Sequence, residues 1–459
     1  MESEPTLEEL RTQIAQITKE MIRLAGKRTS IAREVGRIKD QKSLPTEDDE
    51  IEDALVREVI AECDNVGLQR KSGLKILNTL LAESKRVQGM NERITPGTVL
   101  SRALALERQG VKVVRLDVGE PDFHPPRAVL KACSEALFSF KTHYTEARGI
   151  PELRAALRRY LASKHGFEAD DGEVTVTPSG RFAVYAALSS VVDEGESAIV
   201  IDPNWPAYRE ALAHLGARPV VVRTTLEEGW TPSVKEIAEA VRPNTKAIVL
   251  SYPNNPTGKG VTGRLFKEIV GLADDLSLTV VSDETYNEYS SKPCPSVLKT
   301  TPKKFILTSS FSKTWAMTGF RIGYAVSSPE TITAMTRITS LLVTSVPEFI
   351  QWGAIRALGS DAEVRRNVGQ MQVRVGAACR ALDGIGSLEY SRPDGAMYLF
   401  PRTKSGESGD SFAERLLGRG VSVTPGSAFG DYPDFFRISL GQPKAVVLEG
   451  LHRISELLS

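Results

Sequence analysis

Apolar residues recur every three or four positions along the first part of the chain. From Leu7 onward the intervals alternate between three and four residues, which places one apolar seam along a long helix. Residues 1–90 show no strand-like alternation, so we predict an all-helical module there. The seam consists of Leu7, Leu10, Ile14, Ile17, Met21, Leu24, Ile31, Val35 and Ile38.

From about residue 99 the pattern changes to short apolar runs that alternate with helical stretches. This alternation predicts an α/β fold, in which helices cover both faces of a mostly parallel sheet. Ligands bind such sheets at the carboxyl ends of the strands, so we expect functional residues where each run ends. Turn-forming residues (NERITPGT) predict a linker at 91–98. The runs are residues 111–119, 173–180, 197–203, 246–253, 278–284 and 304–310.

Composition narrows the class of protein. The chain has 459 residues, of which 41% are hydrophobic and 25% charged, as in ordinary globular enzymes. Lys and Arg balance Asp and Glu at 58 each, which gives no reason to expect binding to nucleic acid or a membrane surface. Four scattered cysteines offer neither a disulfide framework nor a zinc spacing, so we expect no metal and a cytoplasmic protein. The acidic N-terminus predicts no signal peptide, and no apolar run is long enough to span a bilayer.

Polar residues interrupt the helical seams. Arg28 breaks the first seam, and Ser84 and Gln88 fall on the seam of the last helix. Asp48 and Glu52 share one face of the helix between them. A guanidinium on a buried seam needs an anion, so one interpretation is a dimerisation arm in which Arg28 pairs with Glu52.

Arg11 and Lys39 suggest a second interpretation. They lie one step off the first seam and 28 residues apart, which is about 42 Å along a helix. They therefore cannot serve one site within one straight helix. If both are functional, Arg11 must come from an antiparallel second copy, which predicts an intertwined homodimer.

The segments LRTQI, GKRTSIAREVGRIK, PTEDDEIE and LLAESKRVQ resemble the all-helical (AroQ-type) chorismate mutases across the first 90 residues. The resemblance implies a chorismate-binding site shared between two chains. Arg28, Ser84 and the partner's Arg11 would hold the carboxylates. Lys39 and Gln88 would face the ether oxygen, and Glu52 and Asp48 would hold the ring hydroxyl and backbone. One position departs from the family: Ile51 stands where an arginine is usual, which leaves room for an inactive domain that serves assembly or sensing.

The segment SSFSKTWAMTGFRIGY (309–324) resembles the lysine signature of class I pyridoxal-phosphate aminotransferases. Eight further motifs follow the family order: LDVGEPDF, HYTEARGIPELR, TPSGRFAVYAAL, PNWPAY, YPNNPTG, SDETY, PDGAMYLFP and FFRISL. The resemblance implies the fold-type I architecture over residues 99–459. It further implies a large cofactor-binding domain at about 140–365 and a smaller α+β domain from about 99–139 plus 366–459.

The same resemblance implies a pyridoxal 5′-phosphate site. Lys313 would bind the cofactor as a Schiff base and later move a proton at the substrate α-carbon. Asp283 would hold the protonated ring nitrogen. Asn255 and Tyr286 would hydrogen-bond the ring oxygen, and Trp205 would stack on the ring face.

The phosphate needs donors at a helix start. Ser179 and Gly180 lie where a run ends and a helical stretch begins, so their N–H groups would face the phosphate. Ser310 and Arg321 would complete the phosphate site, and Tyr144 would reach the phosphate of a neighbouring subunit, again implying a homodimer.

Substrate contacts come from three more positions. Arg437 would clamp the α-carboxylate, and Gly119 would line the same site. Arg181, in the cofactor-binding turn, is either a ligand for a distal carboxylate or a solvated first-turn arginine.

Together the modules predict a bifunctional enzyme that converts chorismate to prephenate and transfers an amino group from glutamate or aspartate. The acceptor would be prephenate, giving arogenate, or phenylpyruvate or 4-hydroxyphenylpyruvate. A different class of protein would be a regulator, in which an aminotransferase-like sensor is fused to a DNA-binding N-terminus. Such an N-terminus would be a basic winged helix that contains strands. Residues 1–90 hold 15 Lys and Arg against 17 Asp and Glu and show no strand pattern.

Overall fold

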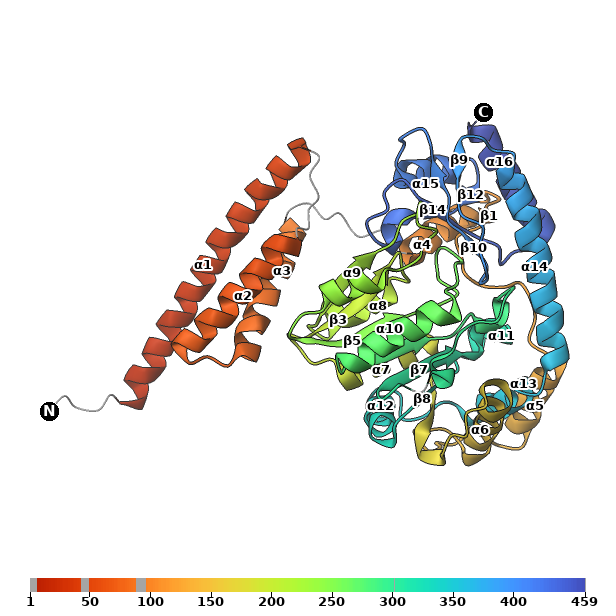
Figure 1. The fold of residues 1–459 in the computed structure, drawn as a ribbon, viewed down its shortest axis with the longest axis horizontal. Helices are drawn as coiled ribbons and strands as arrows, with labels where there is room; N and C mark the ends of the chain where they lie inside the picture. Colours follow the sequence, from red (N-terminus) through yellow and green to blue (C-terminus); the bar gives the residue numbers. More distant parts are fainter. Residues whose placement is uncertain (1–5, 43–48, 88–95, 301, 459) are drawn as a thin grey trace. The chain divides into compact units, whose positions relative to one another are not determined.

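The computed structural model describes residues 6–42, 49–87, 96–300 and 302–458. The chain divides into two compact units, Met1–Arg93 and Ile94–Ser459 (Figure 1). Within the described residues, no helix combines the length and apolar character that a membrane crossing requires. The finer boundaries proposed inside the larger unit remain predictions.

The first unit is helical, as the apolar spacing predicts. It consists of α1 (Leu7–Lys42), α2 (Asp49–Val66) and α3 (Arg70–Val87), and α3 packs against both other helices. Helix α1 turns a face of small residues towards α3, where Ala32 and Gly36 are buried. The apolar seam lies beside this face and stays exposed, from 65% at Leu7 to 38% at Val35. The seam is therefore not the face that packs within one chain.

The second unit is built on a seven-stranded sheet. Strand β8 runs antiparallel to both of its neighbours, and the other adjacent pairs run parallel. This confirms the predicted mostly parallel sheet with helices on both faces. In spatial order the strands are β2 (Val174–Thr177), β8 (Gly323–Ser327), β7 (Phe305–Ser310), β6 (Thr279–Asp283), β5 (Thr245–Leu250), β3 (Ser197–Asp202) and β4 (Arg218–Arg223).

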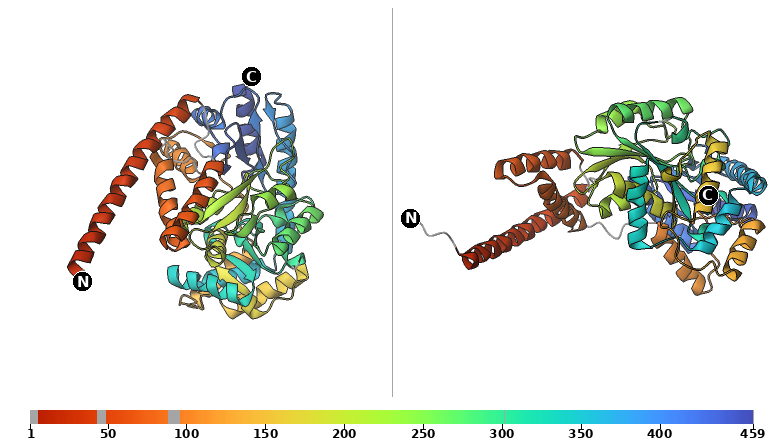
Figure 2. Two further views of the ribbon diagram at one scale, coloured as in Figure 1. Left: turned by 60° about the vertical axis from the view of Figure 1, so that its left-hand side comes forward. Right: turned by 90° about the horizontal axis from the view of Figure 1, so that it is seen from below.

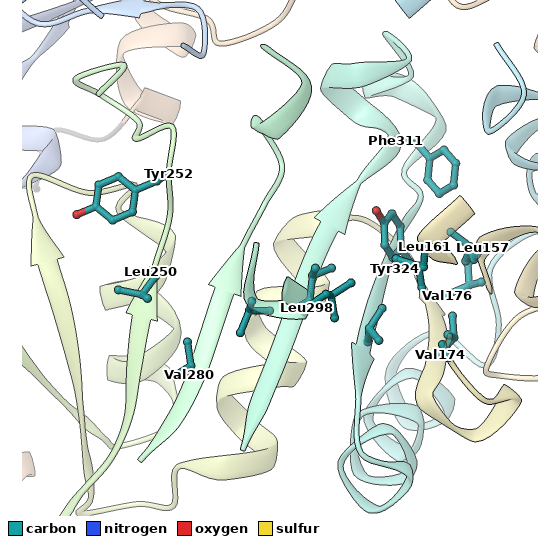
Figure 3. Packing of buried hydrophobic residues seen from close by; sticks show 14 of the residues in the cluster. Leu157, Leu161, Val174, Val176, Leu250, Tyr252, Val280, Leu298, Phe311 and Tyr324 are labelled. Atoms are coloured by element: carbon teal, nitrogen blue, oxygen red, sulfur yellow. The ribbon is translucent and has the colours of Figure 1, made fainter. Parts of the chain in front are cut away.

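Alternate residues of these strands enter two different cores, because successive side chains in a strand point to opposite faces. Ala198 and Val200 of β3 pack in one core, and Ile199 and Ile201 pack in the other. Figure 3 shows the second core from close by, where Val174 and Val176 lie near helix α6. The first core includes α7 (Gly180–Val191), α8 (Ala207–His214) and α12 (Pro329–Leu342), and the second α5 (Arg127–Phe138), α6 (Pro151–His165), α9 (Val234–Ala240), α10 (Gly263–Asp275) and α13 (Glu348–Ala357) (Figure 2).

A third core is formed by segments that precede the large sheet in the sequence and by segments that follow it. The predicted run at 111–119 forms β1 (Val114–Arg115), which pairs with β12 (Val421–Ser422) rather than joining the large sheet. Leu116 packs against Gly450, where an added Cβ would lie 2.5 Å from the leucine. The other elements there are β9 (Leu388–Glu389), β10 (Tyr398–Leu399), β11 (Arg402–Thr403), β13 (Thr424–Pro425), β14 (Phe436–Ser439), α14 (Asp361–Asp383), α15 (Gly409–Gly418) and α16 (Lys444–Leu458).

Helix α4 (Pro96–Arg108) opens the described part of the second unit. Its first three residues fall within the segment 91–98 that the sequence predicts as a linker; the linker boundaries remain a prediction. Proline is favoured in the first turn of a helix, because its missing N–H has no partner there in any case. Arg102 of this helix forms an ion pair with Glu414 of α15, which ties α4 to the third core.

Candidate active sites

The carboxyl ends of the large sheet's strands surround one cavity of 340 Å³. The segments after β2, β3, β5, β6 and β7 supply residues to it, and so does the β14 strand. Such a volume suits a small-molecule ligand. Of the residues predicted for the second unit, the cavity is lined by Gly119, Gly180, Arg181, Trp205, Asn255, Asp283, Tyr286, Ser310, Lys313, Arg321 and Arg437.

Lys313 lies in α11 (Phe311–Thr314), a single turn directly after β7. Its ammonium donates a hydrogen bond to the Gly119 carbonyl. Burial lowers the pKa of Lys313 to about 8, and the nearby cations Arg437 and Arg321 act in the same direction against the carboxylate of Glu120. A lysine with this pKa is partly neutral near pH 7, which is the state a nucleophilic amine needs.

Asp283 ends strand β6 and is held by three donors. Tyr208 Oη donates to Oδ2 at 2.8 Å, and Thr285 donates to Oδ1 from Oγ1 at 2.7 Å and from its backbone N–H at 3.2 Å. Burial raises the pKa of Asp283, and the donors from Thr285 and Tyr208 oppose that rise. The carboxylate is thus oriented and buried, and no cationic side chain of the described residues forms an ion pair with it, as suits a ligand for a protonated ring nitrogen.

One end of the cavity is prepared for an anion. Helix α7 begins at Gly180, and Ser179 caps it by accepting a hydrogen bond from the Phe182 N–H at 3.1 Å. A side chain at Gly180 would press on Ser310, whose Cβ would lie 2.9 Å away. Burial, and then the positive charge of Arg181, lower the pKa of Arg321. Arg321 beside the start of a helix forms a site where a phosphate dianion would be stabilised.

Arg437 lies on β14 and is 3% exposed. Its Nη1 donates to Asn255 Oδ1 at 2.9 Å, and its Nη2 donates to the Asp117 carbonyl. Its Nε is buried and has no hydrogen-bond partner among the described residues. A guanidinium with an unsatisfied buried donor in the cavity wall is suited to binding a carboxylate.

Trp205 and Arg181 form the outer wall. The Arg181 guanidinium lies over the Trp205 ring at 4.6 Å from the ring centre, and its Nη1 is 3.3 Å from Glu210 Oε2. Both charged side chains are more than half exposed, so their ion pair is weak and easily exchanged.

Two predicted residues lie outside the lining of this cavity. Ser179 acts at the helix cap behind Gly180, and Tyr144 is 86% exposed. Exposure of Tyr144 agrees with the predicted reach into a neighbouring subunit, which remains a prediction.

The cavity is also lined by residues to which the sequence assigned no role. Tyr208 and Tyr398 both occur in motifs that match the family, but a motif does not reveal which group the hydroxyl of a tyrosine contacts. Thr285 follows Asp283 by two residues, a spacing typical of a local side-chain hydrogen bond. Pro96 and Leu100 of α4 line the mouth, and no motif marks them.

In the first unit, Arg28 faces helix α3. Its Nη1 donates to the Leu80 carbonyl at 2.7 Å and to the Ser84 hydroxyl. Ser84 is buried and itself donates to the Leu80 carbonyl at 2.8 Å. Both acceptors are neutral, so they leave the charge of Arg28 uncompensated at these contacts. A half-buried cation and a hydroxyl therefore lie together between α1 and α3.

The remaining residues predicted for this unit divide into three groups. Lys39 on α1 and Glu52 on α2 are described and half-buried. Asp48 and Gln88 lie outside the described residues. Arg11 is exposed and precedes Arg28 by 17 residues, or about 26 Å along α1, so it cannot reach the Arg28 site in its own chain. Ile51, at the position of the family's arginine, is 65% exposed.

Comparison with known proteins matches both units. Residues 111–454 match the family described as aminotransferase class I and II, and residues 10–89 match chorismate mutase type II. The aspartate aminotransferase of Pyrococcus horikoshii is 34% identical over 75% of this chain and 90% of its own length. The aspartate/prephenate aminotransferase of Thermus thermophilus is 34% identical over 82% of this chain and 98% of its own. The solved aspartate aminotransferase from Thermus thermophilus with maleate superposes with a TM-score of 0.77, at 34% identity, over 81% of this chain and 98% of its own.

The cavity and the sheet define a fold-type I transferase. The chain belongs to the aminotransferase class I and II family and carries a chorismate mutase type II domain before it. Both families expected from the sequence are confirmed, as are the two enzyme classes. The family's cofactor is pyridoxal 5′-phosphate, and the cavity fits it. A buried amine, a buried carboxylate and an anion site at a helix start are the three partners that the cofactor's aldehyde, ring nitrogen and phosphate require.

Proposed function

We propose that the chain makes prephenate from chorismate in its first unit and transfers an amino group to an aromatic-pathway keto acid in its second. The preferred acceptor we propose is prephenate, which would yield arogenate. The observation that carries this choice is the mutase unit in the same chain, because amination of its product would join the two activities without a missing step. The charge of the cavity supports a substrate with two carboxylates, whether acceptor or donor. Four cationic side chains line it, namely Arg181, Lys313, Arg321 and Arg437. The cofactor and one α-carboxylate account for three of them, which leaves Arg181 for a second carboxylate.

Dicarboxylic substrates would use all four cations. Aspartate, glutamate and prephenate each carry two carboxylates, whereas phenylpyruvate and 4-hydroxyphenylpyruvate carry one. The Thermus relatives named for aspartate and prephenate, and the structure with maleate, support a second carboxylate site. Phenylpyruvate and 4-hydroxyphenylpyruvate remain the second candidate acceptors, because the dicarboxylic donor alone would also explain Arg181.

In the mutase reaction no nucleophile is required, because the rearrangement is pericyclic. The site has to hold a compact conformer and stabilise charge that develops on the ether oxygen. Arg28 would bind one carboxylate with help from Ser84. Lys39 and Gln88 would donate to the ether oxygen, and Glu52 and Asp48 would hold the ring hydroxyl and neighbouring backbone.

In the transfer reaction pyridoxal phosphate would supply the electron sink that makes the substrate α-proton acidic. Asp283, held by Tyr208 and Thr285, would keep the ring nitrogen protonated. Lys313 would act as nucleophile and then carry the proton to and from the α-carbon. Arg437 would orient the α-carboxylate, and the Gly119 carbonyl would be released when Lys313 leaves it. Ser310, Arg321 and the start of α7 would fix the phosphate, and Asn255 and Tyr286 the ring oxygen.

We further propose a homodimer with active sites shared in both units. The exposed apolar seam of α1 supports a partner in the first unit, since a row of nine apolar residues would otherwise face water. A second copy would also bring an Arg11 to the Arg28 site.

Around Tyr144 in the second unit, Phe138 and Phe140 are exposed as well, which supports a partner surface there. The free cysteines agree with the cytoplasmic location expected from the sequence.

Supplying the whole protein with chorismate and either glutamate or aspartate tests the proposal, with the products separated by mass. We expect arogenate to form without any added enzyme. Prephenate that accumulates and is never aminated would contradict the prephenate assignment. Phenylalanine or tyrosine formed only after prephenate is converted to its keto acid by another enzyme would support the second candidate.

Replacing Arg181 with methionine separates two-carboxylate substrates from one-carboxylate substrates. We expect kcat/KM for aspartate and prephenate to fall by about 10- to 100-fold, because one charge-assisted hydrogen bond to the distal carboxylate is lost. For phenylpyruvate with an alanine donor the change should stay within about threefold. Steady-state kinetics with each substrate pair gives the comparison, and equal losses for both classes would show that Arg181 is only structural.

The alternative is an inactive mutase domain that assembles the protein or senses an end product. Ile51 favours it, because an exposed isoleucine cannot supply the charge that the family's arginine provides. A dimer of residues 1–90 that folds but leaves chorismate unchanged would favour this alternative.

A further inference from the structure

Tyr398 lies between two groups of the aminotransferase site and is 1% exposed. Its hydroxyl is 2.6 Å from the hydroxyl of Tyr286, and the face of its ring lies 4.6 Å from the centre of the Arg437 guanidinium. Its remaining surroundings are tight. A Cβ on Gly119 would come within 2.2 Å of the same hydroxyl, so only a glycine leaves room for it.

The direction of the Tyr286–Tyr398 hydrogen bond follows from proton counting. Each phenol has one proton to donate. Burial raises the pKa of Tyr286 well above its ordinary value, so Tyr286 stays protonated. If Tyr286 gives its proton to the ring oxygen of the cofactor, it can only accept from Tyr398. Tyr398 must then be the donor of the 2.6 Å bond.

Two aromatic rings contact the Arg437 guanidinium. Its central carbon lies over the Tyr398 ring at 4.6 Å from the ring centre and over the Phe429 ring at 4.9 Å, while Asn255 Oδ1 accepts from Nη1 at 2.9 Å. Rings that hold the guanidinium plane restrict the directions in which its free Nε–H can donate. The ring of Tyr398 therefore acts on Arg437, and its hydroxyl acts on Tyr286.

We propose that Tyr398 is a positioning residue with two separable roles: its hydroxyl fixes Tyr286 as a donor to the cofactor's ring oxygen, and its ring aligns Arg437 for the substrate carboxylate. The second role rests on the proposed function, in which Arg437 binds the α-carboxylate. The first needs only that the chain binds its family's cofactor in this cavity.

Two substitutions separate the roles in the cofactor-loaded dimer. Tyr398→Phe keeps the ring and removes the hydroxyl, and Tyr398→Leu removes both. The first readout is the pH titration of the bound cofactor's visible absorption band, measured without substrate. The second is the KM for aspartate and glutamate. Tyr432 supplies matched controls, because it is buried, donates to the Thr224 carbonyl at 2.9 Å and faces Arg223 at 5.5 Å, yet does not line the cavity.

We expect Tyr398→Phe to raise the apparent pKa of the absorption change by about half a unit, because Tyr286 becomes a weaker donor when nothing donates to it. Its KM should stay within about twofold of wild type. Tyr398→Leu should show the same spectral shift and raise KM by about 3- to 10-fold. Tyr432→Phe and Tyr432→Leu should change neither readout.

The proposal fails if Tyr398→Phe binds the cofactor and titrates like wild type. It also fails if Tyr398→Leu folds, binds the cofactor and keeps the wild-type KM, or if the Tyr432 variants reproduce both changes. The proposed function would fail in a different way, since wild-type enzyme would then bind the cofactor but show no spectral change with either amino acid. The titration without substrate tests the hydroxyl role in either case.

Discussion

Replacing Lys313 with alanine should abolish amino-group transfer and leave chorismate turnover unchanged. We expect kcat for transfer to fall by at least about 10⁴-fold, because in the proposed mechanism the same side chain would supply the nucleophile and the proton carrier. The proposed mutase site lies around Arg28 in the other compact unit, so the rate of chorismate turnover should stay within about twofold of wild type. Measuring both reactions on one preparation provides the comparison.

The Lys313 variant needs evidence that its cavity is intact. It should still bind pyridoxal phosphate through Asp283, Arg321 and the start of α7, but without the pH-dependent absorption of a covalent Schiff base. Lys259→Ala is a suitable control, since Lys259 pairs with Asp394 at 2.9 Å and does not line the cavity. Near-normal transfer by the Lys313 variant would show that the site has been assigned to the wrong residues.

The reciprocal substitution is Arg28→Ala. We expect kcat/KM for chorismate to fall by about 10²- to 10³-fold, because the substrate carboxylate loses a charge-assisted hydrogen bond in a partly buried site. Transfer by the second unit should not change. A continuous ultraviolet assay of chorismate loss measures the first effect.

Arg37→Ala separates the function of Arg28 from a general effect of removing an arginine from α1. Arg37 is exposed and pairs with Glu34 at 2.6 Å on the same helix. It should retain chorismate turnover, and both variants should keep the helix content and the solution mass of the wild type. A fully active Arg28→Ala enzyme would overturn the proposed mutase site.

Much of the second site could be predicted from sequence because its residues occur where strands end. Asp283 closes β6 and Lys313 follows β7 by three residues, so apolar runs and motif order locate both. Tyr208 and Tyr398 could not be assigned roles in this way. Their partners, Asp283 and Tyr286, lie 75 and 112 residues away in the chain. A hydrogen bond over such a separation depends on how distant helices and strands pack together in the folded chain.

The helical unit shows a different limit. Spacing predicted the helices and the apolar seam of α1, but not which face α3 would cover. Helix α3 packs against Ala32 and Gly36, because small residues let two helix backbones approach closely. The periodicity of apolar residues identifies the most apolar face of a helix. Which face packs within one chain depends also on the size of its side chains.

The two sites also differ in how much chain must be present before they can form. Arg28 and Ser84 are 56 residues apart, and the helices that carry them, α1 and α3, can pair as soon as α3 is complete. Arg437 meets the Asp117 carbonyl across 320 residues, and its strand β14 is the last strand of the chain. On the ribosome, where synthesis proceeds from the N-terminus, the first unit can therefore fold while the second is still being made. The cofactor cavity closes only when synthesis is almost finished, so cofactor capture is a late event in the life of each new chain.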